Sequence, residues 1–167
     1  DPSDRANSAE PTADFSASIS QGVKGLRFVV PDFCFLEIST EPVAKAVREA
    51  ANMLEELGAQ RVDVTMPSEL DLVGPAAITL FLAEGGTVHR DTLASHPEMY
   101  CQETRSFLSL AENISAHAYL QAQRIRTRLT DEFARVFQSV DLMVTPTLAM
   151  TAPHLDAQEI EGAQGPL

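Results

Sequence analysis

Few side chains in this 167-residue sequence have the types and spacing that catalysis requires. Glu84 and His89 could form an acid–base couple or a pair of metal ligands, but they lie five residues apart. Helical residues share a face when they are three or four positions apart, so this spacing disfavours both roles. His117 and His154 have no partner nearby in the sequence and are interpreted as structural or exposed. We therefore expect no metal site and no cofactor.

Cys34 is a candidate nucleophile by residue type alone. A cysteine attacks as the thiolate, which a neighbouring cation stabilises, and no basic residue lies close to Cys34 in the sequence. Cys34 and Cys101 also form no metal-binding motif and no disulfide framework. Both are interpreted as inert, reduced thiols, as is usual for a cytoplasmic protein.

Thr145 and Thr147 are the candidate binding residues, on either side of Pro146. The segment 141–147 has the apolar character of a strand that Pro146 stops. In open α/β sheets the carboxyl ends of the strands line ligand crevices, which makes both hydroxyls candidates for contacts with a substrate. The alternative, that they only satisfy hydrogen bonds at a strand end, stays open.

The elements that would position these residues begin with a strand–helix–strand unit. Apolar residues predict a strand over 25–31, and alternation of Val62, Val64 and Met66 predicts another over 61–67. Between them, apolar positions spaced by three and four predict a helix over 42–57, with Gly58 as its C-cap. The expected inner face of this helix comprises Val43, Val47, Ala50, Leu54 and Leu57. A helical crossover of this length favours a parallel strand pair.

The second half of the chain is predicted to be mainly helical. We expect a buried helix over 73–89 that Gly85-Gly86 weakens at its end, and an irregular stretch over 90–103. Helix is expected again over 103–138, broken near 113–115. Its inner face is predicted from an apolar stripe that comprises Tyr119, Ala122, Ile125, Leu129, Phe133, Val136 and Phe137.

The fold class is therefore α/β, with a mixed, mostly parallel sheet flanked by helices. We expect one partial domain over 1–167, with an extended loop over 1–21, a core over 22–150 and a loose tail over 151–167. The chain starts without Met and ends without a closing element, which suggests a piece of a longer polypeptide; a natural short protein is the alternative.

The charge balance argues against anionic partners. Acidic residues number 24 and basic residues 12, for a formal charge of −12, so nucleic acids and anionic membranes are not expected to bind. No uninterrupted apolar run approaches the roughly 18 residues that span a bilayer, and no signal peptide is recognised. These features favour a cytoplasmic location.

The order of the motifs resembles the middle-to-late part of the amidase-signature family, which includes bacterial amidases and the A chain of glutaminyl-tRNA amidotransferases. The strand that begins Gly25-Leu26-Arg27 leads to Leu57-Gly58-Ala59 and then to Met66-Pro67. Ser115-Ala116, Tyr119-Leu120 and three arginines follow before the strand that ends in Thr145-Pro146-Thr147. The opening Asp1-Pro2-Ser3-Asp4 is also similar to a family loop.

The resemblance implies hydrolysis of carboxamide C–N bonds. In the family, a serine attacks the carbonyl, a second serine in a cis peptide relays a proton, and a lysine is the base. It implies a small-molecule amide substrate, a pocket near Thr145 and Thr147, and Arg105 as a contact for a charged substrate end. A surface role for Arg105 stays the alternative. The resemblance does not fix the oligomeric state, and a homo-oligomer is compatible with it.

The family's catalytic residues are missing from the matched region. They lie upstream in the family, and this sequence has no Gly-Gly-Ser-Ser run; Lys24 does not fit the base position. We expect no catalytic residue here and an inactive isolated chain. The alternative function is a non-catalytic binding or interaction module derived from an amidase, and an independent enzyme that uses Cys or His is strongly disfavoured.

Overall fold

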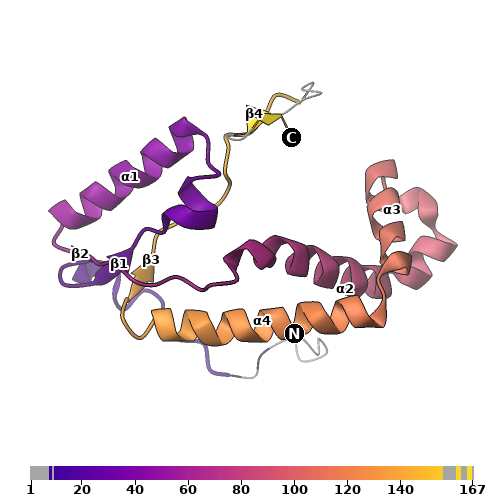
Figure 1. The fold of residues 1–167 in the computed structure, drawn as a ribbon, viewed down its shortest axis with the longest axis horizontal. Helices are drawn as coiled ribbons and strands as arrows, with labels where there is room; N and C mark the ends of the chain where they lie inside the picture. The colour runs from indigo at the N-terminus through magenta and orange to yellow at the C-terminus, as the bar shows by residue number, and fades with distance from the viewer. Residues whose placement is uncertain (1–7, 9, 156–160, 163–164, 167) are drawn as a thin grey trace.

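The computed structural model describes residues 8, 10–155, 161–162 and 165–166. It contains a parallel three-stranded sheet in the order β2-β1-β3, which lies at the opposite end of the molecule from α3 (Figure 1). The strands are β1 (Arg27–Val29), β2 (Gln60–Arg61) and β3 (Leu142–Met143). The main helices are α1 (Glu41–Glu56), α2 (Val73–Ser95), α3 (Gln102–Ser109) and α4 (Ala116–Val136). The predicted α/β class with a parallel sheet is confirmed.

Helix α1 crosses from β1 to β2 and covers one face of the sheet (Figure 1). Pro42 lies in its first turn, where the missing N–H costs nothing. Gly58 follows the helix with φ of +93°, a conformation that glycine adopts without strain. These two residues account for observed bounds within one residue of the predicted 42–57.

The inner face of α1 differs from the predicted stripe. Ala44 and Ala51 are fully buried against Phe28, with Val47 and Leu54 packed around them. Ala50 is exposed and Leu57 is 60% exposed, so these two assignments were wrong. The small alanines let α1 approach the sheet closely. The face of α1 that packs on the sheet is therefore centred on Ala44 and Ala51, and it does not include Leu57.

The other face of the sheet packs on the end of α4. Val29 is buried there with Val136 and Val140, while Phe28 and Val30 point to α1. This division follows from the alternation of side chains along a strand. The short sheet is therefore covered on both faces, as expected for parallel strands.

The predicted strand over 61–67 is much shorter in the structure. Only Gln60–Arg61 pairs with β1, because β1 itself ends at Val29 before Pro31, which has no N–H to donate. The alternation that predicted the strand is still present. Val62, Val64 and Met66 are half-buried, and Asp63 and Thr65 between them are exposed, although no ladder continues beside them.

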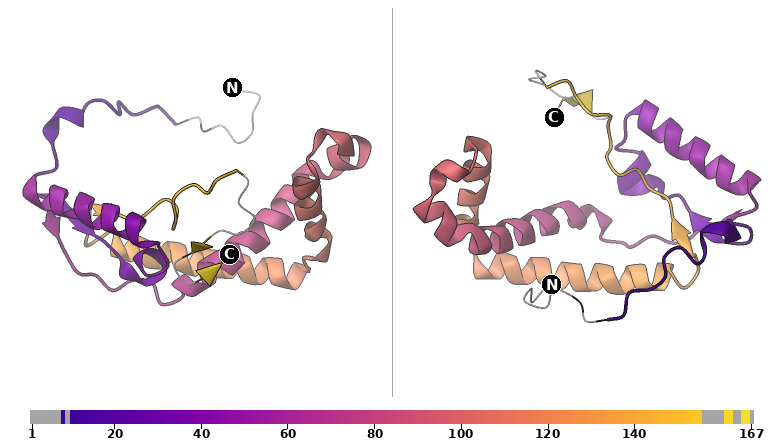
Figure 2. Two further views of the ribbon diagram at one scale, coloured as in Figure 1. Left: turned by 90° about the horizontal axis from the view of Figure 1, so that it is seen from above. Right: turned by 180° about the vertical axis from the view of Figure 1, so that it is seen from behind.

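Helices α2, α3 and α4 form an arm that extends from the sheet (Figure 2). Ala76 and Leu80 of α2 are buried against Ala122 of α4. The predicted stripe of α4 is mostly confirmed, since Ala122, Leu129 and Val136 are buried; Phe137, at 48% exposure, is the exception.

Helix α2 is longer than predicted, and the irregular stretch is correspondingly shorter. Gly85 and Gly86 lie inside α2, which continues to Ser95. A side chain at Gly86 would overlap the Cβ of Ala111, so glycine there permits close approach of the next segment. The remaining non-α residues before α3 include a 3-10 turn, Pro97–Met99.

The break predicted near 113–115 is confirmed. Helix α3 is followed by a 3-10 turn, Leu110–Asn113, and α4 then begins after Ser115. The Ser115 hydroxyl accepts a hydrogen bond from the Ala118 N–H at 3.1 Å, which caps the new helix.

The ends of the chain are described only in part. Ser8 and residues 10–21 are exposed, as expected for a loop, apart from a 3-10 turn at Ile19–Gln21. In the tail, β4 (Glu161–Gly162) pairs antiparallel with β5 (Gly165–Pro166). The rest of 156–167 lies outside the described residues, as do 1–7 and 9.

Candidate functional site

The segments that follow the three strands leave the sheet at the same edge, because the strands are parallel. The segments after β1 and β3 lie side by side there. The Thr40 N–H donates to the Ala149 carbonyl at 2.7 Å, and the Val144 N–H donates to the Val29 carbonyl at 2.9 Å. Backbone hydrogen bonds thus hold together, at the carboxyl edge, two segments that are more than one hundred positions apart in the sequence.

Thr145 and Thr147 lie on this edge, as the sequence placed them. Thr145 is half-buried and Thr147 is exposed. Among the described residues, no side-chain hydrogen bond involves either hydroxyl.

The segment after β1 forms the other side of the edge. Cys34 adopts φ of +62°, and its N–H donates to Oε1 of Glu37 at 3.1 Å. The Ser39 hydroxyl donates to the Phe35 carbonyl at 2.7 Å, which ties the turn together. A positive φ at a non-glycine residue costs free energy that the surrounding contacts must offset.

The Cys34 thiol is not activated in this environment. Burial raises its pKa, and the negative charges of Glu37 and Asp71 raise it further. The thiolate is therefore disfavoured near neutral pH, which agrees with the interpretation of Cys34 as inert. Cys34 and Cys101 are both free thiols.

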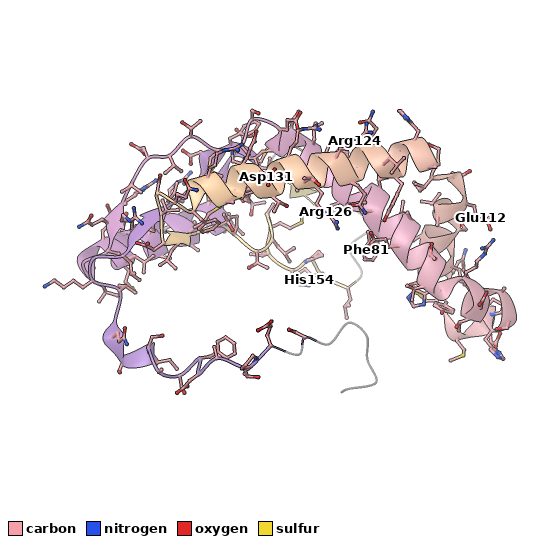
Figure 3. The ribbon with its side chains drawn as sticks, turned by 90° about the horizontal axis from the view of Figure 1, so that it is seen from below. Phe81, Glu112, Arg124, Arg126, Asp131 and His154 are labelled. Atoms are coloured by element: carbon pink, nitrogen blue, oxygen red, sulfur yellow. The ribbon has the colours of Figure 1, made fainter. Side chains whose placement is uncertain are left out.

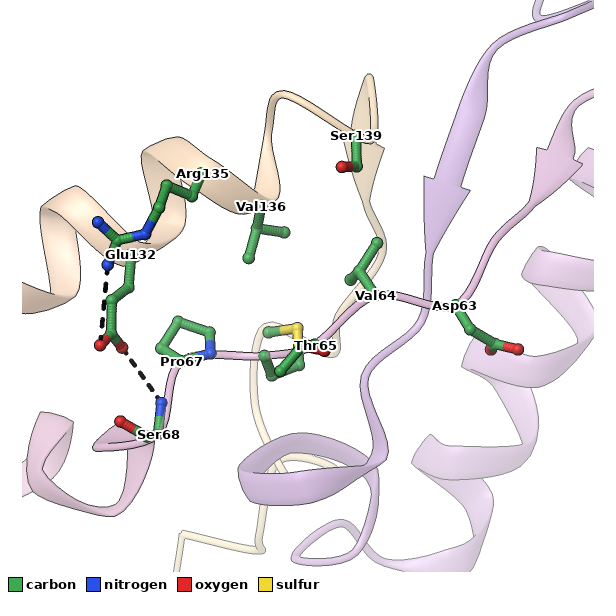
Figure 4. Close-up of a pocket in the computed structure, with 10 residues that line it drawn as sticks. Asp63, Val64, Thr65, Pro67, Ser68, Glu132, Arg135, Val136 and Ser139 are labelled. Carbon is green, nitrogen blue, oxygen red and sulfur yellow. Dashed lines mark hydrogen bonds and ion pairs between the residues drawn. The ribbon is translucent and has the colours of Figure 1, made fainter.

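A second candidate is an open hollow of about 570 Å³ between the segment after β2 and the end of α4. Figure 4 shows Glu132 at its side, between Ser68 and Arg135. Its carboxylate accepts from the Ser68 N–H at 3.1 Å and lies 3.9 Å from the Arg135 guanidinium. The carboxylate is thus already partnered on both sides. The walls of the hollow mix polar and apolar side chains, and no nucleophile and base are in contact there among the described residues.

The sequence analysis did not find this hollow. Ser68 and Glu132 are 64 residues apart, and neither belongs to a motif. The only local signal was Pro67-Ser68 at the end of an alternating stretch, which marks a strand end and no particular chemistry.

The structure does not bring Arg105 near the two threonines. Arg105 belongs to α3, at the far end of the arm from β3 (Figure 1). Its Nη1 donates to the Pro97 carbonyl at 3.5 Å, and the residue is exposed.

Glu84 and His89 have separate partners, in line with their spacing. Glu84 Oε1 accepts from the Tyr119 hydroxyl at 3.2 Å, whereas His89 Nδ1 lies 3.0 Å from the Tyr100 hydroxyl. His117 is exposed on α4, and His154 is exposed on the segment after β3 (Figure 3). Within the described part of the chain, no group of three or more His, Cys, Asp or Glu could hold a metal ion.

Curated relatives of the chain are amidases and amidotransferase components. An amidase of Pseudomonas putida is 37% identical over 152 residues, which are 91% of this chain and 32% of the relative. The A component of the glutamyl-tRNA(Gln) amidotransferase of Myxococcus xanthus is 32% identical over 91% of this chain and 36% of its own length. The chain therefore spans about a third of the length of these relatives.

Solved structures give the same picture. A crystal structure of an amidase matches with a TM-score of 0.74 and 27% identity, over 87% of this chain and 33% of its own. A second match has a TM-score of 0.80 and 26% identity, over 96% of this chain and 34% of its own. That structure is described as a vestigial protein complex that reveals the origins of an s-triazine catabolic enzyme.

The family comparison covers almost the whole chain. The family model described as Amidase matches residues 1–165. Together with the parallel sheet and the order of motifs from Gly25 to Thr147, this match decides the family. The chain belongs to the amidase family.

Proposed function

We propose that this chain is part of an amide hydrolase of the amidase-signature type, which cleaves carboxamide C–N bonds of small molecules. The observation that carries the proposal is the family match over residues 1–165, combined with a length about a third that of the curated relatives. The nucleophilic serine, the relay serine and the lysine base would belong to the part of the domain that this chain does not include. The chain alone is then inactive.

The role of this part is to complete the sheet and to form one wall of the substrate pocket. Thr145 and Thr147 would face the acyl group, because both lie at the carboxyl edge, where the segment after β3 runs beside the segment after β1. Arg105 stays a predicted contact for a charged substrate end. In the structure its Nη1 donates to the Pro97 carbonyl at 3.5 Å, away from the carboxyl edge. In this proposal residues 22–150 are the core of a partial domain.

The chemistry would be that of a serine hydrolase. The lysine, through the relay serine, would take the proton of the nucleophile as it attacks the carbonyl carbon. Backbone N–H groups would stabilise the oxyanion. As the oxyanion collapses, the C–N bond would break and the amine would leave with the proton returned by the relay, after which water would hydrolyse the acyl-enzyme to the acid. The two free thiols, Cys34 and Cys101, support a cytoplasmic location.

A chimera tests the proposal. The matched segment of the Pseudomonas putida amidase is replaced by this chain, and ammonia release from small aliphatic and aromatic carboxamides is measured. Hydrolysis is expected from the chimera and not from the isolated chain. A chimera whose nucleophilic serine is changed to alanine gives the background rate. Ammonia release by the pure isolated chain would overturn the proposal, as would a folded chimera without activity.

The second candidate is a non-catalytic interaction module derived from an amidase. It is favoured by the TM-score of 0.80 with a structure described as a vestigial protein complex. A module that persists alone needs a closed core, so the purified chain would melt cooperatively and would not bind the dye ANS. Strong ANS binding by the isolated chain would count against this candidate.

A further inference from the structure

Helix α2 is apolar on more sides than the structure covers. By length and composition its extended stretch, Leu70–Ser95, could cross a membrane, which the sequence analysis did not anticipate. Its most apolar window of 18 residues has a mean hydropathy of 1.2. Only 17% of that window is buried. A helix that is hydrophobic all round is normally enclosed by other elements.

Two sides of α2 have partners. Ala76 and Leu80 pack on α4, and Gly86 lies against Ala111 in the turn before α4. Glu84 lies at the border with α4, where it accepts a hydrogen bond from Tyr119. These contacts leave the third side of α2 open.

The open side carries a stripe of large apolar residues, which we call the outer stripe. Val73, Ala77, Phe81 and Val88 follow one another at spacings of four, four and seven, and Ile78 flanks them. Exposure rises along the stripe, from 40% at Val73 and 51% at Ile78 to 62% at Phe81 and 77% at Val88. Figure 3 shows Phe81 projecting from α2, where its ring lies 5.7 Å from the ring of Phe107 between centroids.

An apolar stripe of this size on a water-soluble surface marks an interaction site. The lengths of the relatives indicate what covers it. The chain spans 32% of the Pseudomonas putida amidase and 36% of the Myxococcus xanthus protein, so about two thirds of a family domain is not represented here. The sheet also has unpaired outer edges at β2 and β3, within the described residues, where further strands could add.

We propose that the outer stripe of α2 is the docking surface for the remaining part of an amidase-family domain. The proposal rests on the proposed function for the identity of this partner, and on the exposure of the outer stripe for its location. Docking would bury Phe81 and Val88 and convert α2 from a surface helix into a core helix. Apolar burial supplies the driving force.

Two other occupants fit less well. A second copy would bring together two chains of formal charge −12, which repel each other. A lipid bilayer would have to accept the neighbouring surface of α4, where Arg124, Arg126 and Asp131 are exposed (Figure 3).

Co-expression is the first test. The chain is produced with the part of the Pseudomonas putida amidase that lies outside the matched region, and the complex is measured by size-exclusion chromatography with light scattering. A 1:1 complex is expected. Phe81→Asp and Val88→Asp should each weaken it by about tenfold or more. Met53→Asp is the matched control, since Met53 is 61% exposed on the outer side of α1.

Cysteine labelling tests the same surface without requiring two separate chains to assemble. In a background of Cys34→Ser and Cys101→Ser, a cysteine replaces Val88 or Met53, and its reaction rate with a maleimide is measured. In the chimera described above, the cysteine at position 88 should react about tenfold more slowly than in the isolated chain. The cysteine at position 53 should react at the same rate in both.

The outcomes separate the two proposals. Protection of position 88 without amide hydrolysis supports the docking surface and overturns the proposed function. Hydrolysis by a chimera whose position 88 stays reactive overturns the docking surface alone. The docking proposal also fails if Val88→Asp abolishes a homodimer of the isolated chain, or abolishes its flotation with phosphatidylcholine–phosphatidylglycerol vesicles.

Discussion

Arg27 and Asp141 hold the first and third strands together through both side chains and backbone. The Arg27 N–H donates to Asp141 Oδ2 at 2.8 Å, and Arg27 Nη2 donates to Oδ1 at 3.0 Å. In return the Asp141 N–H donates to the Arg27 carbonyl at 2.8 Å. Because β1 and β3 are so short, this clamp helps to fix the register that pairs Phe28 with Leu142. It therefore sets where Thr145 lies along the carboxyl edge.

The clamp predicts a pH dependence of stability. Hydrogen bonds from the Arg27 side chain, then its backbone N–H, hold the pKa of Asp141 below its ordinary value of 3.8. A carboxylate with a depressed pKa stabilises the fold above its ordinary pKa and loses that effect as the pH falls through the lower folded value. Asp141→Asn should thus be less stable than the parent at pH 7, and the difference should vanish in acid.

Urea denaturation of both proteins between pH 7 and pH 2 measures this difference. Asp131→Asn, at an exposed position of α4, is the control and should follow the parent throughout. A gap between Asp141→Asn and the parent that persists unchanged at the lowest pH would show that the charge of Asp141 does not contribute.

Gly86 predicts a loss of stability on a minimal substitution. In Gly86→Ala the new methyl group would overlap the Cβ of Ala111, so the turn before α4 must move. We expect a net cost of about 1–3 kcal/mol in the free energy of unfolding, despite the better helix propensity of alanine. Gly74→Ala is the control in the same helix, because nothing lies within 4 Å of its added Cβ. Equal effects of the two changes in urea denaturation would refute the close approach.

The N-cap residues of α1 and α4 should lose different amounts of stability when each is replaced by alanine. Ser115 accepts a hydrogen bond from the Ala118 N–H, whereas the side chain of Thr40, at the start of α1, makes no capping bond. Ser115→Ala should therefore cost about 1 kcal/mol, and Thr40→Ala should cost clearly less. Thermal unfolding followed by circular dichroism distinguishes them, and a larger loss in Thr40→Ala would contradict the assignment.

Thr145 predicts a change in substrate use within the active chimera. Thr145→Val keeps the shape and removes the hydroxyl, so kcat/KM should fall by about three- to tenfold if that hydroxyl bonds the substrate. Thr130→Val is the control, since the Thr130 hydroxyl bonds the Arg126 carbonyl on the surface of α4 at 2.8 Å. Unchanged kinetics in Thr145→Val would remove Thr145 from the pocket.

Local signals predicted those elements whose ends the sequence itself determines. Pro42 and Gly58 bound α1, and Ser115 begins α4, because each acts on the backbone of its own neighbours. Strands β1 and β3 were found for the same reason, as short apolar runs closed by Pro31 and Pro146.

Features that depend on a distant partner could not be read in the same way. The length of β2 depends on where β1 ends. The role of Gly86 depends on Ala111, which lies 25 positions later in the sequence and packs against it. Sequence placed Thr145 at the carboxyl edge because a strand end is a local feature. It missed the contact between Ser68 and Glu132, which only the packing of α4 against the segment after β2 creates.

The pairing of β1 on both sides has a consequence for the order of folding. Its bond to β2 closes a short loop through α1, whereas the clamp from Arg27 to Asp141 closes one of 114 residues. Closing the longer loop costs about 1 kcal/mol more in chain entropy. We expect β1 and β3 to pair only after α2, α3 and α4 have formed and brought the two strands closer together. We expect α1 and β2 to acquire protection in pulse-labelled hydrogen exchange before β3 does. The carboxyl edge, and with it the position of Thr145, would then be among the last parts of the chain to form.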